Sequence, residues 1–139
     1  MTIDTNTSLY CVLGNPVSHS LSPVMHNSAF AHTGYKGIYL AFKVTDIASA
    51  ITGIKALGIK GASITIPHKV AVMEFLDDID EEANKIGAVN TIVNKDGRLY
   101  GYNTDCIGLG LGLWPGKDIS GRTTEGFGTG IEVCCIHFG

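Results

Sequence analysis

The hydrophobic positions of this chain follow two alternating patterns, short apolar runs and longer stretches with helical spacing. The continuous apolar run over residues 9–13 is typical of a strand buried on both faces of a sheet. Ile47, Ile51 and Ile54 recur at helical spacing, and Leu57 continues the same face. This reasoning predicts strands over residues 9–13, 38–44, 61–66, 88–93 and 98–102, helices over residues 22–33, 45–57, 67–76 and 103–113, and a short acidic helix between residues 79 and 86.

Residues that favour turns and helix ends separate these elements. Ser22 is a suitable N-cap, with Pro23 at the first helical position. Pro67 predicts a sharp change from strand to helix, because proline has no N–H to lose at a helix start. Asp96-Gly97 is a strong hairpin signal. The alternation of strands and helices predicts an α/β domain with three layers, α/β/α, whose mostly parallel sheet carries one antiparallel hairpin strand.

The last part of the chain follows a different pattern. Residues 114–139 contain several glycine-containing turn signals and little hydrophobic periodicity. Within them, only residues 131–138 have the pattern of a strand. The sequence therefore predicts one α/β domain over residues 1–113, followed by an atypical tail over residues 114–139.

The composition fits a compact domain and argues against several classes of protein. Of the 139 residues, 45% are hydrophobic, 17% are charged and 18 are glycine, which is typical of a folded chain. The net charge of −3 and the lack of a Lys/Arg run argue against a nucleic-acid-binding protein. No apolar run approaches the roughly 18 residues of a membrane span, and no signal pattern opens the chain, so we expect a cytoplasmic protein without membrane contact. The cysteines and histidines lack metal-site spacing, so no metal is expected.

Three polar segments lie at the ends of predicted strands, where ligands bind in open α/β sheets. They are residues 18–22, residues 65–69, and Asn90 together with residues 103–105. Hydroxyl groups at a helix start bind carboxylates, because free N–H groups and the helix dipole favour an anion there. Simple helix capping by Ser22 is the alternative interpretation. Ser20 has no capping role in this interpretation, which favours binding.

Lys69 and Asp105 are the candidates for acid–base chemistry. A lysine beside an aspartate can orient a substrate hydroxyl and carry its proton. With its usual pKa of about 10.4, a lysine acts as a base only where burial lowers that value, and a neighbouring aspartate has the opposite effect. Such a pair can therefore polarise a substrate as well as remove its proton. The alternative is a solvated lysine at an ordinary strand–helix junction, or a surface salt bridge worth about 0–1 kcal/mol.

Five sequence blocks stand out when these segments are combined. They are Gly14-Asn15-Pro16, His19-Ser20-Leu21-Ser22-Pro23 with His26, Thr65-Ile66-Pro67-His68-Lys69, Gly87-Ala88-Val89-Asn90-Thr91 and Gly101-Tyr102-Asn103-Thr104-Asp105. In this order and spacing, the chain resembles shikimate dehydrogenases over about residues 8–113. The resemblance implies a substrate-binding α/β domain that normally precedes an NADP-binding Rossmann domain. It also implies reversible hydride transfer between NADPH and 3-dehydroshikimate, which yields shikimate.

The resemblance implies roles for individual residues. Substrate binding would involve Ser20, Ser22, Thr65, Lys69, Asn90 and Asp105. The two serines would hold the carboxylate, whereas Thr65, Asn90 and Asp105 would bind the ring hydroxyls. Lys69 beside Asp105 would be the catalytic lysine, and Glu81 corresponds to a position near the cofactor. These residue types suit shikimate or 3-dehydroshikimate, because a ring with a carboxylate and several hydroxyls needs an anion site and directional polar groups.

The chain also departs from the family pattern. Ser63 replaces a usual asparagine, which could weaken one polar contact, and Cys106 replaces a common glycine. In the tail, Gly126 and Gly128 are followed by Ile131 at the position of a third glycine, and no strand precedes them. The context of a dinucleotide-binding turn is missing. We therefore expect a truncated form that binds NADP poorly and has little or no dehydrogenase activity.

Two alternatives stay open at this point. The hydroxyl-binding residues also suit a relative that uses quinate, or both quinate and shikimate. The other alternative is a non-catalytic remnant domain that associates with itself as a homo-oligomer. Loss of a second domain would expose apolar surface at Leu109, Leu111 and Leu113, which favours self-association.

Overall fold

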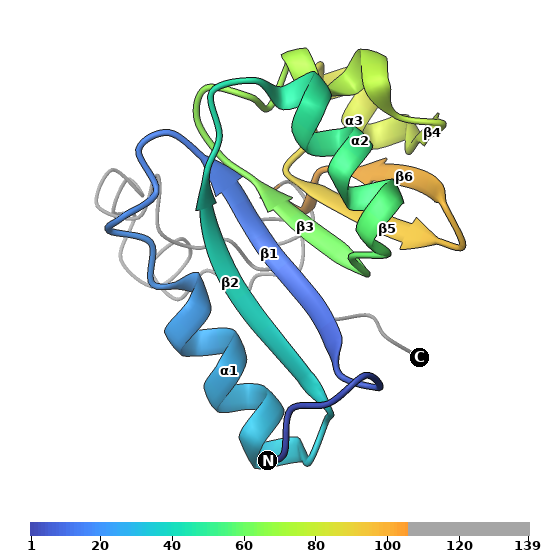
Figure 1. Cartoon of the computed structure of the whole chain (residues 1–139). Helices are drawn as coiled ribbons and strands as arrows, with labels where there is room; N and C mark the ends of the chain where they lie inside the picture. The colour runs from blue at the N-terminus through green and yellow to red at the C-terminus, as the bar shows by residue number, and fades with distance from the viewer. Residues whose placement is uncertain (106–139) are drawn as a thin grey trace, which may run out of the picture.

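Within residues 1–105, which the computed structural model describes, the chain forms six strands and four helical segments (Figure 1). The strands are β1 (Ser8–Gly14), β2 (Gly37–Lys43), β3 (Gly61–Ile64), β4 (Asp78–Ile79), β5 (Thr91–Lys95) and β6 (Arg98–Tyr102). The helices are α1 (Ser22–Thr33), α2 (Ile47–Leu57), α3 (Glu81–Ile86) and the 3₁₀-helix η1 (Ala71–Phe75).

The described strands form one sheet in the order β2-β1-β3-β5-β6-β4. β1 pairs in parallel with β2 and β3, and β4 pairs in parallel with β6. β5 is antiparallel to both of its neighbours, β3 and β6. In Figure 1 the arrowheads of β1, β2 and β3 accordingly point the same way, and that of β5 points the other way. The predicted mostly parallel sheet with one antiparallel hairpin strand is confirmed.

Helices cover both faces of the sheet, so the predicted three layers are confirmed (Figure 1). Because side chains of a strand alternate between faces, β1 contributes to two separate cores. Tyr10 and Val12 pack with Phe30 of α1 on one face. Cys11 and Leu13 belong to the larger core on the other face, which α2, η1 and α3 cover. Both faces of β1 are therefore covered by other parts of the protein.

The hairpin between β5 and β6 forms where Asp96-Gly97 predicts it. Asp96 and Gly97 have φ values of 53° and 89°, and positive φ at both residues is what a type I′ turn requires. β5 begins at Thr91, later than the predicted residue 88, because the Val89 N–H donates to the Lys69 carbonyl at 2.8 Å instead of to a neighbouring strand. This bond is used again at the candidate site.

α2 forms as its apolar spacing predicts, with one exception. Asp46 caps its start by accepting a hydrogen bond from the Ser49 N–H. The buried residues of the helix are Ile47, Ile51 and Ile54. Leu57 is 76% exposed, so its predicted place on the buried face is wrong. Three residues of an α-helix turn through about 300°, which places Leu57 about 60° beyond Ile54 and outside the face that contacts the sheet.

The start of α1 differs from the prediction. α1 begins at Ser22, but its N-cap is Leu21, whose side chain makes no capping bond. The Ser22 N–H donates to Ser20 Oγ at 3.3 Å. The expectations that Ser22 is the N-cap and that Ser20 has no capping role are therefore wrong. The Ser20 hydroxyl thus accepts a hydrogen bond from a helix-start N–H.

The helix predicted over residues 67–76 is also wrong. Residues 65–68 instead form a turn in which the His68 N–H donates to the Thr65 carbonyl at 3.0 Å. The Ile66–Pro67 bond is cis, which makes this a type VI turn. Pro67 thus occupies the third position of a turn and not the first turn of a helix. The only regular helix in this stretch is η1, which begins at Ala71.

Several predicted features lie outside the described residues. They are Cys106, the helix beyond Asp105, the domain boundary at residue 113 and the tail with its strand over residues 131–138. Thr104 and Asp105 are helical, and Asn103 Oδ1 accepts from the Asp105 N–H at 3.1 Å, so a helix starts where the sequence predicts it. Among the helices of residues 1–105, none has both the length and the apolar character needed to cross a membrane.

The burial of Ile54 and the exposure of Leu57 predict different costs of truncation. Ile54→Ala should lower the free energy of unfolding by about 2–5 kcal/mol, because it leaves a cavity beneath α2. Leu57→Ala, on the same helix, should change it by less than about 0.5 kcal/mol. Urea unfolding followed by circular dichroism measures both values. Equal losses in the two variants would contradict this placement of α2.

Candidate active site

The candidate residues lie at the edge of the sheet where the parallel strands end. Residues 18–22 follow β1, residues 65–69 follow β3, and residues 103–105 follow β6. Asn90 immediately precedes β5, and because β5 runs antiparallel, its first residues lie at this same edge. The reversed strand therefore adds a fourth polar segment to the place where ligands bind in open α/β sheets.

The structure brings Lys69, Asp105 and Asn90 together. Lys69 Nζ lies 3.6 Å from Asp105 Oδ2, and the two side chains are 32% and 50% exposed. The other carboxylate oxygen, Asp105 Oδ1, accepts a hydrogen bond from Asn90 Nδ2 at 3.1 Å. One carboxylate thus contacts both a cation and an amide, and it remains accessible from solution.

Asn90 is the centre of a buried polar network. It is 3% exposed, and its Oδ1 accepts from the Thr104 N–H at 3.0 Å and from Thr91 Oγ1 at 2.9 Å. The Thr104 hydroxyl lies 3.1 Å from Asn90 Nδ2. Because a backbone N–H can only donate, the bond from Thr104 identifies the amide oxygen and directs Nδ2 towards Asp105. The network therefore orients the Asp105 carboxylate.

Thr104 is a site residue that the sequence reasoning missed. It stands in the block Asn103-Thr104-Asp105, but only Asp105 was assigned a role. The signal that could have found it is its place between two assigned polar residues at a helix start, where a threonine N–H has no helical partner. In the structure that N–H binds Asn90 Oδ1, and Thr104 is 7% exposed.

Lys69 is positioned by its backbone and by its neighbour His68. The Lys69 carbonyl accepts from the Val89 N–H at 2.8 Å, which places Lys69 beside Asn90. His68 is 6% exposed, and its Nε2 lies 2.7 Å from the Val44 carbonyl. A carbonyl only accepts, so Nε2 carries the hydrogen. His68 thereby ties the lysine-bearing turn to the segment after β2, a role that the sequence did not indicate.

Thr65 is held at the end of β3 by close packing against β1. Its N–H donates to the Leu13 carbonyl at 3.0 Å. Gly14, the next residue of β1, faces the Thr65 methyl group so closely that a side chain at this position would overlap it. The absence of a side chain at Gly14 is therefore a condition for the position of Thr65.

The two serines lie at the start of α1. Ser22 is 6% exposed, and Ser20 is partly exposed and bonded to the Ser22 N–H. The Asn15 N–H donates to the Ile66 carbonyl at 2.9 Å, which ties the segment after β1 to the turn after β3. The segment that leads into α1 is thus tied to the turn that carries Thr65 and Lys69, and the two serines stand at a helix N-terminus.

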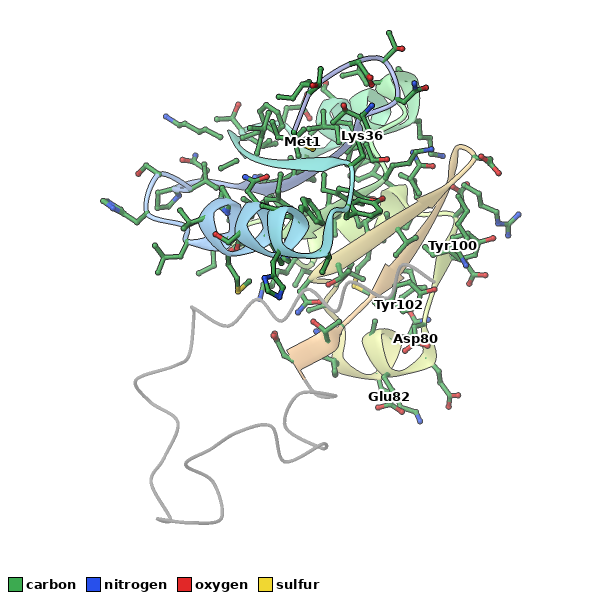
Figure 2. All side chains as sticks on the ribbon, turned by 90° about the horizontal axis from the view of Figure 1, so that it is seen from below. Met1, Lys36, Asp80, Glu82, Tyr100 and Tyr102 are labelled. Carbon is green, nitrogen blue, oxygen red and sulfur yellow. The ribbon has the colours of Figure 1, made fainter. Side chains whose placement is uncertain are left out.

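Glu81, by contrast, belongs to a solvated helix. It begins α3, its Oε1 lies 2.9 Å from Lys85 Nζ, and its side chain is 81% exposed. Asp80 and Glu82 flank it; Figure 2 shows both at the opposite end of the molecule from Met1 and Lys36. Three consecutive carboxylates repel the phosphates of a dinucleotide. The cofactor role of Glu81 stays a prediction, and its surroundings do not favour it.

A known protein family matches the part of the chain that carries this geometry. The family model of the shikimate dehydrogenase substrate binding domain matches residues 12–92, which is more than half of the 139 residues. The chain belongs to this family. The match of the substrate binding domain includes Ser20, Ser22, Thr65, Lys69 and Asn90, and it ends before Asp105.

Individual relatives agree with the family assignment. The chain is 62% identical over 137 residues to the shikimate dehydrogenase (NADP(+)) of Bacillus cereus strain B4264, covering 94% of this chain and 48% of that protein. Shikimate 5-dehydrogenase from Listeria monocytogenes, solved in complex with shikimate and NAD, has a TM-score of 0.78 at 38% identity and covers 84% of this chain and 41% of its own. The 5-ketofructose reductase of Gluconobacter sp. strain CHM43 has a TM-score of 0.76 at 34% identity, with 79% and 40% covered. The chain thus spans about half the length of these relatives.

The contact between Gly14 and Thr65 predicts that Gly14→Ala is destabilising. The added methyl group should displace Thr65 and lower the free energy of unfolding by about 1–3 kcal/mol. Gly53→Ala in α2 is the matched control, because a side chain there meets nothing within 4 Å. The control should be neutral or stabilising by up to about 1 kcal/mol, since alanine favours a helix. Chemical denaturation measures both, and a neutral Gly14→Ala would contradict the contact.

Proposed function

We propose that this chain is the substrate-binding part of an NADP-dependent shikimate dehydrogenase, which interconverts 3-dehydroshikimate and shikimate. The observation that carries the proposal is the contact of Lys69 Nζ with the Asp105 carboxylate, which Asn90 also holds, at the ligand-binding edge of the sheet. Membership of the substrate binding domain family supports it, as does the likeness to a Listeria monocytogenes protein solved with shikimate.

Lys69 would handle the proton of the reacting oxygen. As an ammonium group it can donate to the carbonyl oxygen of 3-dehydroshikimate during reduction, and in the reverse direction it takes the proton from the shikimate hydroxyl. Asp105 directs the amine from 3.6 Å, and its half-exposed carboxylate can itself accept a hydrogen bond from a ring hydroxyl. The pair can thus orient the substrate and carry its proton.

The remaining polar groups would orient the ring. Thr65, at the end of β3, offers a hydroxyl that can donate and accept. Asn90 reaches a substrate only by giving up a bond, because its amide is buried and bonded to its neighbours. Ser20 and Ser22 would hold the carboxylate, since the N-terminus of the 12-residue helix α1 favours an anion.

NADP, when bound, would supply the hydride donor or acceptor. The position assigned to the cofactor, Glu81, does not fit a dinucleotide, because it lies in the acidic and exposed first turn of α3 and is paired with Lys85. The hydride itself would come from the bound cofactor and not from a side chain of residues 1–105. Their contribution to the proposed reaction is substrate orientation and proton transfer.

Two other functions are kept as candidates, each for a specific reason. The similarity to a 5-ketofructose reductase, whose name gives a substrate other than shikimate, is the reason that a quinate-using relative stays open. Comparing the thermal stabilisation by shikimate and by quinate separates these two. A self-associating binding module is favoured by exposed apolar side chains at the start of α1, which are Leu21, Val24 and Met25. It differs from the main proposal because it requires no shikimate binding.

If the site is correct, Lys69→Ala and Asp105→Ala should each weaken shikimate binding by about tenfold or more, since each removes a charged contact to the ring oxygens. Isothermal titration calorimetry on the complete 139-residue chain measures the change. Lys55→Ala is the matched control, because it removes another exposed lysine–aspartate pair, with Asp77 at 3.1 Å, away from the site. Unchanged affinity in both site variants would refute the assignment.

We further expect the 139-residue chain to show little or no NADP-linked oxidation of shikimate. The physical reason is that Glu81, the described residue assigned to the cofactor, lies among exposed carboxylates that repel the phosphates of a dinucleotide. In addition, the glycines of the tail sequence lack the context of a dinucleotide-binding turn. NADPH absorbance follows the reaction, and the Bacillus cereus relative assayed in parallel provides the positive control. Turnover comparable to that of the relative would overturn this expectation while leaving the substrate site intact.

A further inference from the structure

Within residues 1–105, contacts to Asn27, His26 and Ser63 hold Tyr39, although it lies in the edge strand β2. It is 2% exposed, and the Asn27 carboxamide both accepts from its N–H and donates to its carbonyl, each at 2.8 Å. The His26 ring stacks on the Tyr39 ring with centroids 4.3 Å apart. The Tyr39 hydroxyl donates to Ser63 Oγ at 2.7 Å. Two contacts thus join Tyr39 to α1, and the third joins it to β3.

The Asn27 contact restrains the backbone of Tyr39. Peptide groups on the outer side of an edge strand have no neighbouring strand to bind. The carboxamide takes the place of such a strand at Tyr39, because it binds the N–H and the carbonyl together. Any shift of Tyr39 along the sheet would break both bonds. The backbone position from which the phenol ring projects is therefore fixed.

The His26 contact is a packing contact and not a hydrogen bond. His26 is 3% exposed, and its Nε2 has no hydrogen-bond partner within the described part of the chain. Burial lowers the pKa of His26, so the ring that stacks on Tyr39 is neutral at neutral pH. The stacked pair fixes the plane of the phenol ring, and with it the direction of the hydroxyl.

The hydroxyl of Tyr39 reaches towards the ligand-binding edge. In the sheet register Tyr39 lies opposite Tyr10 of β1, whereas Ser63 lies opposite Val12, two residues further along β1. The Tyr39 side chain therefore crosses β1 diagonally to reach β3. Ser63 and Thr65 are two residues apart in extended chain, so their side chains point to the same face of the sheet.

Both ends of this hydrogen bond are buried, since Ser63 is 1% exposed and Tyr39 is 2% exposed, and each side chain is bonded to the other. We propose that Tyr39 is a positioning residue: through its bond to Ser63 it sets the direction of Thr65 and thereby the fit of the substrate ring hydroxyls. The inference rests on the proposed function, since it assigns Thr65 to those hydroxyls. It adds a residue of the edge strand that does not contact the ligand but affects how tightly the ring hydroxyls bind.

The inference predicts different effects on the binding of the carboxylate end and of the hydroxyl end of the ligand. Tyr39→Phe removes the hydroxyl but keeps the ring, so the contacts to His26 and Asn27 on α1 remain. The carboxylate-binding start of α1 should then be unaffected, and only the hydroxyl end of the site should loosen. A residue that merely stabilised the fold would weaken both ends alike.

The test compares two ligands on the complete chain. Shikimate carries the carboxylate and the ring hydroxyls, and cyclohex-1-ene-1-carboxylate carries the carboxylate alone. In NMR titrations, Tyr39→Phe should weaken shikimate binding about five- to tenfold and change cyclohexenecarboxylate binding less than about twofold. Ser63→Ala should reproduce this result, and the double variant should lose little more, because both changes delete the same bond.

Tyr10→Phe provides the matched control. Tyr10 is 4% exposed in the neighbouring strand, and its hydroxyl lies 2.6 Å from that of Tyr35, so the substitution also deletes one tyrosine hydroxyl contact on the same face. It should leave the affinity for both ligands unchanged. Equal effects of Tyr39→Phe and Tyr10→Phe on shikimate, or equal loss of both ligands in Tyr39→Phe, would overturn the inference alone. Failure of the unaltered chain to bind shikimate would overturn the proposed function and this inference together.

Discussion

The hydrogen bond from the Val89 N–H to the Lys69 carbonyl connects the two halves of the candidate site. It forms because β5 is antiparallel to its neighbours, so that Val89 and Asn90, which precede this strand, lie at the edge where β3 ends. Lys69 and Asn90 become neighbours through this bond. Asn90 donates a hydrogen bond to the Asp105 carboxylate, and this carboxylate in turn lies beside Lys69 Nζ. A single reversed strand therefore accounts for a contact between side chains that are 36 residues apart in the numbering.

The site is supported from below by a sheet that is packed on both faces. Gly14 admits Thr65 at the end of β3, and His68 ties the lysine-bearing turn to the Val44 carbonyl. Tyr39, which is bonded to α1, in turn restrains Ser63 of β3 through a hydrogen bond. Polar groups held in this way need little reordering when a ligand binds, which is how a small domain can present a polyol site with defined geometry.

Family membership and site chemistry answer different questions. The chain belongs to the family of the shikimate dehydrogenase substrate binding domain, yet a 5-ketofructose reductase has a similar structure. The fold alone therefore leaves the substrate open, and the choice depends on which polar groups face the ring. Here a lysine–aspartate pair, a threonine and a helix start with two serines suit a ring that carries both hydroxyls and a carboxylate.

The sequence by itself determined the elements whose signals are local. The spacing of Ile47, Ile51 and Ile54 defined α2, and Asp96-Gly97 defined the hairpin, because both depend on residues close together in the chain. Only the tertiary structure decided what depends on distant partners. It placed Pro67 in a turn, since the neighbouring backbone bonds to β1 and to Val89 hold that segment. It also revealed the roles of Thr104, His68 and Tyr39, whose hydrogen bonds reach other segments of the chain, and local pattern carries no information about such contacts.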